Sequence, residues 1–181
     1  MHTTKKDHDA REGTQPIVVG YDGSAAAGVA LDTAIRIADL LRAPVRLIST
    51  WQVPIAFQGY PAGGWLVQED QQTRIDEAVR CRFGEHMPAW FSTVSVEGGA
   101  ARVLIAASQQ AQMLVVGSRG HGGFVGLLLG SVSTACAGLA NCPVLVVHAP
   151  AGAQADATDL HQGAATSDDA EQSEREGAAV C

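Results

Sequence analysis

Apolar residues in the middle of the chain follow two alternating patterns. Short unbroken runs, such as Met113-Leu114-Val115-Val116, are typical of strands that are buried on both faces of a sheet. Between these runs, apolar residues recur at spacings of three and four, which indicates amphipathic helices. The predicted strands span residues 17–20, 45–51, 94–97, 113–116 and 144–147; the predicted helices are one that Ser24 caps and Pro44 ends, and others at 67–87, 100–110 and 131–140.

Strands and helices thus alternate along the chain. This order predicts an α/β fold, in which a parallel sheet carries helices on both faces. Ligands of such sheets bind outside the carboxyl ends of the strands, where the strand order reverses. The loops after Val19, Thr50 and Val116 are therefore the candidate positions for a site.

Composition and charge limit the fold to one domain. The chain has 181 residues and a net charge of -7. Residues 1–14 are polar and are predicted to be a disordered lead, and 150–181 are predicted to be a disordered acidic tail, because neither segment has enough apolar residues to form a core. The domain is expected at 15–149, where charge is nearly balanced. This balance argues against nucleic acid as a partner.

Two features that the sequence lacks bear on where in the cell the protein is expected. The N-terminal residues include no apolar segment typical of a secretory signal, and no apolar run reaches the roughly 18 residues of a membrane span. The cysteines have no zinc-site spacing. We therefore expect a cytoplasmic protein that makes no membrane contact.

The glycine-rich loop from Gly117 to Ser131 is the strongest candidate for chemistry. It leaves a buried strand and enters a helix, whose first amide groups and positive dipole end favour an anion. Alanine at Gly117 or Gly120 is expected to remove the ligand and leave the fold intact. The loop lacks the lysine of a Walker motif and the third glycine of a Rossmann fingerprint. A purely structural crossover loop is the alternative.

The spacing Gly117-x2-Gly120-x9-Gly130-Ser131 resembles the nucleotide-binding motif of the universal stress protein family. The segments 17–24 and 141–147 resemble the family's first and last strands, so the resemblance covers about 15–149. It implies a five-stranded parallel sheet in the order 3-2-1-4-5. It also implies the ATP-binding branch of the family, since the glycine motif is complete.

The resemblance further implies a set of site residues. Asp22 matches the family's aspartate that contacts the nucleoside, Gly20 lies beside it, and Thr50 stands where the adenine pocket usually has valine. The residues that match the phosphate-binding segment are Gly117, Arg119, Gly120, Gly130, Ser131, Val132 and Ser133.

The expected function is that of a cytoplasmic stress-response regulator that binds ATP, alone or with Mg²⁺, and acts on a protein partner that the sequence does not name. No residue is a clear general base for the γ-phosphate, so the most that is expected is slow ATP hydrolysis. The alternatives are an adenylating or ATP-hydrolysing enzyme of the same architecture and a nucleotide-free interaction module. An unguarded edge strand at 144–147 also predicts a homodimer.

Overall fold

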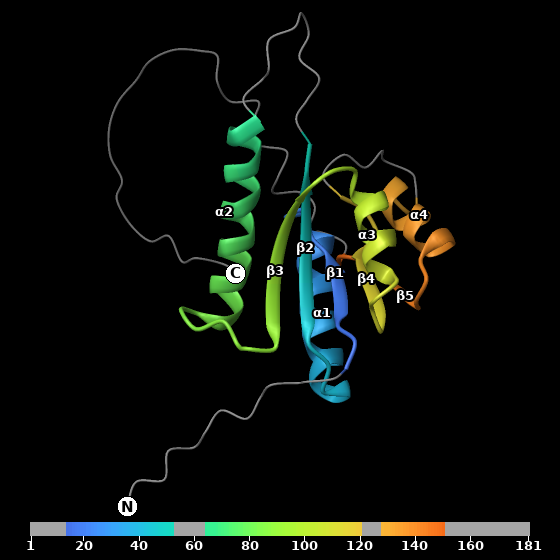
Figure 1. Ribbon diagram of the computed structural model, residues 1–181, viewed down its shortest axis with the longest axis horizontal. Coiled ribbons are helices and arrows are strands. Elements are labelled where there is room, and N and C mark those ends of the chain that lie inside the picture. Colours follow the sequence, from blue (N-terminus) through green and yellow to red (C-terminus); the bar gives the residue numbers. More distant parts are fainter. Residues whose placement is uncertain (1–13, 53–63, 121–127, 151–181) are drawn as a thin grey trace, which may run out of the picture. The chain divides into compact units, whose positions relative to one another are not determined.

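The computed structural model describes residues 14–52, 64–120 and 128–150 of the chain. Strands and helices alternate along these residues as the sequence predicts (Figure 1). Their bounds are β1 Ile17–Gly20, α1 Ala25–Leu41, β2 Val45–Trp51, α2 Gly64–Phe83, β3 Phe91–Glu97, α3 Ala100–Ser108, β4 Met113–Gly117, α4 Ser131–Leu139 and β5 Val144–Val147.

The five strands form one parallel sheet in the order β3-β2-β1-β4-β5, which confirms the predicted fold class. In the middle of the sheet, Val19 of β1 pairs with Leu47 of β2 on one side and Val115 of β4 on the other. The chain leaves β1 toward β2 and later returns to the other side of β1 in β4. The strand order therefore reverses at β1, and the carboxyl ends of β1, β2 and β4 meet there.

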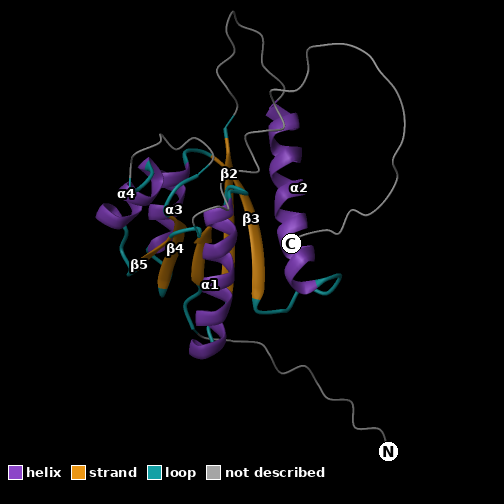
Figure 2. Cartoon of the chain, turned by 180° about the vertical axis from the view of Figure 1, so that it is seen from behind, coloured by secondary structure: helices purple, strands orange, loops and turns teal. Residues whose placement is uncertain are grey.

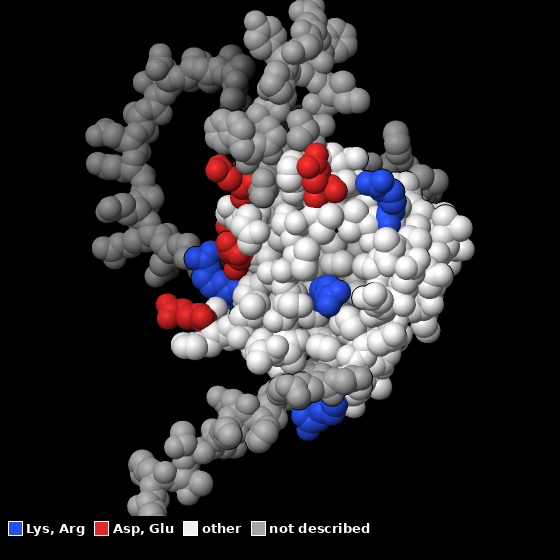
Figure 3. Space-filling view, viewed as in Figure 1, with Lys and Arg blue, Asp and Glu red and all other residues white. Residues whose placement is uncertain are grey.

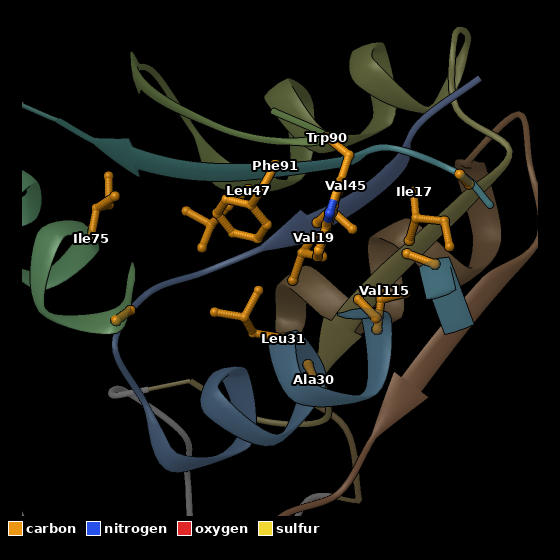
Figure 4. Packing of buried hydrophobic residues seen from close by; sticks show 14 residues of the cluster. Ile17, Val19, Ala30, Leu31, Val45, Leu47, Ile75, Trp90, Phe91 and Val115 are labelled. Carbon is orange, nitrogen blue, oxygen red and sulfur yellow. The ribbon is translucent and has the colours of Figure 1, made fainter. Parts of the chain in front are cut away.

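Helices cover both faces of the sheet. α1, which lies in front of the strands in Figure 2, packs on one face together with α2, and α3 and α4 pack on the opposite face. The first face holds a core in which Leu31 and Ile75 meet Val19, Leu47 and other buried strand residues (Figure 4). On the second face, side chains such as Leu104 of α3 and Cys136 of α4 pack against the alternate residues of the same strands.

Several element boundaries differ from the sequence-based prediction, and three of them have a clear local reason. α1 ends at Leu41, before Pro44, because Arg42 adopts a left-handed conformation with φ 51°. α2 ends at Phe83, not at residue 87, because Gly84 has φ 64°. β3 begins at Phe91, three residues early, because this edge strand alternates buried and exposed positions and so lacks an apolar run.

The chain divides into two units, Met1–Ala149 and Pro150–Cys181, and every element above belongs to the first. The predicted disordered lead and acidic tail lie outside the described residues except for Thr14 and Pro150, so the domain limits of 15–149 stay predictions. None of the described helices combines the length and apolar character needed to cross a membrane.

Candidate functional site

A pocket of about 460 Å³ opens at the carboxyl ends of β1, β2 and β4, where the strand order reverses. Its volume is within the range of about 300–1,000 Å³ that is common for small-molecule sites. All ten residues named from the sequence line it. They are Gly20, Asp22, Thr50, Gly117, Arg119, Gly120, Gly130, Ser131, Val132 and Ser133.

The glycine loop is held at its two ends by main-chain hydrogen bonds. Ser118, the first residue after β4, donates its amide to the carbonyl of Val147 in β5 over 2.7 Å. The Ser118 carbonyl in turn accepts from the amide of Gly130, also over 2.7 Å. Residues 121–127, the middle of the loop, lie outside the described residues. The two ends of the loop, Ser118 and Gly130, are therefore hydrogen-bonded to each other beside the pocket.

The N-terminus of α4 faces the pocket without a side-chain cap. Its N-cap residue is Gly130, with φ -75° and ψ 167°, and no side chain of the described residues caps the first turn. By contrast, the hydroxyl of Ser24 caps α1 by accepting from the amide of Ala27 over 3.2 Å. The first amides of a helix carry partial positive charge and need acceptors. The α4 terminus can thus receive an anion.

Arg119 adds a second feature that fits an anion. Its Nε is buried and has no hydrogen-bond partner among the described residues. A buried N–H donor without a partner is costly, by about 1–3 kcal/mol. Its backbone carbonyl lies 3.4 Å from the hydroxyl of Ser24 in the β1–α1 turn. The guanidinium group is therefore available to a ligand of the pocket.

Asp22 contributes the only carboxylate among the described residues that line the pocket. One of its oxygens, Oδ1, accepts from the amide of Ser24 over 3.0 Å. The other, Oδ2, lies against Gly120, where an added Cβ would collide with it. Asp22 thus joins the β1–α1 turn to the glycine loop, a contact that the sequence did not indicate.

The three motif glycines differ in what an added Cβ would contact. This difference corrects part of the expectation for alanine at these positions. A Cβ at Gly117 would lie 2.9 Å from backbone atoms of Ala26 and Ala27, so this glycine is required for the packing of α1 against β4. The expectation that alanine at Gly117 leaves the fold intact is therefore wrong on steric grounds. At Gly130 an added Cβ would meet its nearest atoms at 3.6 Å, which is ordinary contact.

Part of the pocket wall is apolar. Ile48, Leu104 and Val116 line it beside Thr50, whose strand partner is Val96. A Cβ at Gly20 would lie 2.7 Å from Cδ1 of Leu104, so the glycine makes room for this leucine. The pocket lining therefore combines polar, anion-accepting groups with an apolar wall.

Sequence reasoning missed eight of the lining residues. They are Tyr21, Ser24, Ala27, Ile48, Ala100, Leu104, Val116 and Leu129. Most were interpreted as core or capping residues, and an apolar pattern alone does not separate a pocket wall from a core. Tyr21 also packs against the α1–α2 core, where burial and, to a smaller degree, the charge of Asp22 raise the pKa of its phenol despite the opposing effect of Arg82.

Comparison with known proteins gives one consistent family. The sequence profile described as the universal stress protein family matches residues 13–148. A universal stress protein of Mycobacterium tuberculosis is 34% identical over 134 residues, which cover 72% of this chain and 44% of the relative. One of Mycolicibacterium smegmatis is 36% identical over 141 residues, which cover 73% and 47%. The chain thus spans less than half the length of these two relatives.

Solved structures agree with the sequence relatives. Universal stress protein UspA from Lactobacillus plantarum aligns with a TM-score of 0.61 at 21% identity, covering 74% of this chain and 98% of that protein, a likeness that shows the fold alone. A universal stress protein solved in complex with cAMP aligns with a TM-score of 0.56 at 26% identity, covering 75% of this chain and 97% of its own.

Proposed function

The chain belongs to the universal stress protein family, and from that membership and the chemistry of its pocket we propose that it is a cytoplasmic stress-response regulator that binds ATP. One observation carries the proposal. Among the described residues, one pocket brings together the uncapped N-terminus of α4, an Arg119 Nε without a partner, a glycine loop and an apolar wall. This combination matches a ligand that carries both phosphates and a flat base.

The phosphate end would be held mainly by main-chain groups. The amides of Ser131, Val132 and Ser133 begin α4 at the pocket wall, and Arg119 supplies the positive charge. Anions bind well at such a terminus because the helix dipole and free N–H donors act together. Ser131 is exposed, and its hydroxyl is a further donor. ATP alone, or ATP with Mg²⁺, fits these groups.

Mg²⁺ would depend on the phosphates for most of its ligands. Among the described residues, no three metal-ligating side chains form a group. Asp22 is the single carboxylate that these residues give the pocket, and we assign it to the nucleoside. Phosphate oxygens and water would therefore supply the ligands of Mg²⁺, which keeps several waters when it binds nucleotides.

A cyclic nucleotide is the second candidate ligand. The relative of known structure that binds cAMP is 26% identical to this chain and shares its fold. We favour ATP because the uncapped α4 terminus and Arg119 together offer more donors than one phosphate group needs. Competition of ATP and cAMP for the same site separates the two candidates: ATP is expected to displace cAMP, and the reverse order of affinity would favour the cyclic ligand.

An enzymatic role is the competing class of function. The described lining offers Asp22 as its only carboxylate, and this group is already bonded to its own turn. We therefore expect binding with at most slow hydrolysis, and a steady-state assay of phosphate release tests this. Sustained turnover would favour an ATP-hydrolysing or adenylating enzyme.

Two substitutions test the division of the pocket. Asp22→Ala is expected to weaken both ATP and adenosine, because Asp22 is assigned to the nucleoside end. Ser131→Ala is expected to weaken ATP more than adenosine, because it faces the phosphates. Each affinity loss should be about 10- to 100-fold, the equivalent of one hydrogen bond to a charged group. Calorimetric titration of both ligands measures it, and equal losses for both ligands in the Ser131 variant would contradict the division.

We further propose that the chain forms a homodimer through β5. This strand is at the sheet edge, and its side chains are only half-buried. Residues 128–147 include no charged side chain, and the part of the surface near α4 and β5 in Figure 3 is largely uncharged. An apolar edge with unpaired main-chain groups is protected when a second strand pairs with it.

Val146→Pro tests the dimer. The carbonyls of Pro143 and Val147 accept from the amides of Leu114 in β4 and of Ser118 directly after it. Main-chain groups of neighbouring residues in a strand point to opposite sides. The Val146 amide therefore points to the open edge. Loss of this amide should give monomers in which β5 still pairs with β4. Leu145→Pro, by contrast, removes an amide that points to β4 and should disrupt the sheet. Light scattering that finds a monomer for the unmodified protein at micromolar concentration would overturn the proposal.

A further inference from the structure

The hydroxyl of Ser133 does not point at a ligand in this structure. The family resemblance placed Ser133 in the phosphate-binding segment, where its hydroxyl would serve as a donor. Instead, Ser133 is 2% exposed, and its Oγ lies 3.0 Å from the carbonyl oxygens of both Ser118 and Gly130. A hydroxyl has one hydrogen, so it donates to one of these oxygens at a time. The hydrogen that a phosphate would need is committed to the main chain.

The two carbonyls that Ser133 contacts are the two ends of the glycine loop. Ser118 follows β4 directly, Gly130 precedes α4, and the Gly130 amide already donates to the Ser118 carbonyl over 2.7 Å. We call this junction of Ser118, Gly130 and Ser133 the neck of the loop. The Gly130 carbonyl also accepts the first helical bond of α4, from the amide of Thr134 over 3.0 Å. The neck therefore connects loop closure to the start of the helix.

We infer that Ser133 is a positioning residue, which holds the neck closed and so fixes the direction of the α4 amides, and that it is not a phosphate ligand. The inference rests on the proposed binding of ATP at this loop. Buried hydroxyls that bond to main-chain groups restrict a loop to one conformation. A loop with an open neck would present the α4 amides to the ligand for only part of the time, which lowers the apparent affinity.

Ser133→Ala and Ser131→Ala form a matched pair for the test. Both remove one hydroxyl from the first turn of α4, one buried at the neck and one exposed. We expect Ser133→Ala to accelerate hydrogen exchange of the Gly130 amide about tenfold in the ligand-free protein, since the neck loses one hydrogen bond. ATP affinity should fall as well, by at most a similar factor, which is reached when the open neck predominates, and adenosine affinity should fall by less than about twofold. Ser131→Ala should leave Gly130 exchange unchanged.

Amides of β2, such as that of Leu47, are the internal reference, because a general loss of stability would accelerate their exchange as well. Ser133→Cys, which keeps the shape of the side chain with a slightly larger atom and a weaker donor, replaces the alanine variant if that variant does not fold. Loss of ATP affinity with Gly130 exchange unchanged would overturn the inference and make Ser133 a direct ligand. Unchanged exchange and unchanged affinity would overturn it too. If the unmodified protein binds no ATP, the proposed function fails, yet Gly130 exchange still reports on the neck.

Discussion

Replacement of Gly130 by aspartate is expected to abolish ATP binding while it stabilises the ligand-free protein. Gly130 has the extended backbone conformation of an N-cap residue, and no side chain of the described residues fills that role at α4. Aspartate is among the strongest N-cap residues because its carboxylate accepts from the first helical amides. A Cβ at this position meets nothing closer than 3.6 Å, so the substitution fits.

The introduced carboxylate would take the place that we assign to the phosphates. It would occupy the α4 amides and repel an anionic ligand, and ATP affinity should fall about 100-fold or more. The cap and the helix dipole together should raise the free energy of unfolding by about 0.5–1 kcal/mol. Adenosine, which has no phosphate, should lose much less affinity.

Gly130→Ala is the matched control, since it adds the same Cβ without a charge or an acceptor. Its ATP affinity should lie between those of the unmodified protein and Gly130→Asp. Calorimetric titration gives the affinities, and urea denaturation gives the stabilities. Retention of ATP affinity in a folded Gly130→Asp protein would exclude the α4 terminus as the phosphate site.

Replacement of Gly117 by alanine is expected to destabilise the fold itself. The added Cβ would lie 2.9 Å from the carbonyl carbon of Ala26 and the amide nitrogen of Ala27. Both atoms belong to the backbone at the start of α1, so neither can move as a flexible side chain can. Overpacking of this kind typically costs about 1–3 kcal/mol, and a backbone neighbour favours the upper part of that range.

Gly138→Ala provides the contrast for this prediction. Gly138 is in α4, where an added Cβ meets no atom within 4 Å. Alanine in an exposed helix should increase stability by up to about 1 kcal/mol. The midpoints of urea denaturation should therefore move in opposite directions for the two variants. A Gly117→Ala protein as stable as the unmodified one would show that α1 and β4 pack differently from this structure.

Much of the fold was predictable because its signals are local. Runs such as Leu114–Val116 indicate buried strands, and their alternation with helical patterns specifies a parallel sheet. The start of β3 was missed, because its alternating pattern belongs to an edge strand with one covered face. The ends of α1 and α2 depend on left-handed conformations at Arg42 and Gly84, which neighbouring residues do not determine uniquely.

The candidate site was predictable as a set of residues and less so as a set of roles. All ten predicted residues line one pocket, because the motif follows β4 and the topology brings β1 and β2 to the same edge. The packing role of Gly117 and the neck contact of Ser133 depend on atoms far away in sequence. Leu104 was missed for another reason: a residue of the pocket wall and a core residue have the same apolar pattern in the sequence.

The most direct test of ATP binding is a calorimetric titration of ATP into the folded, nucleotide-free protein, with adenosine titrated in parallel. We expect saturable binding of one ATP per chain, and weaker binding of adenosine because it leaves the α4 terminus and Arg119 without an anion. Saturation by neither ligand up to millimolar concentration would contradict the assignment and favour a glycine loop with a purely structural role.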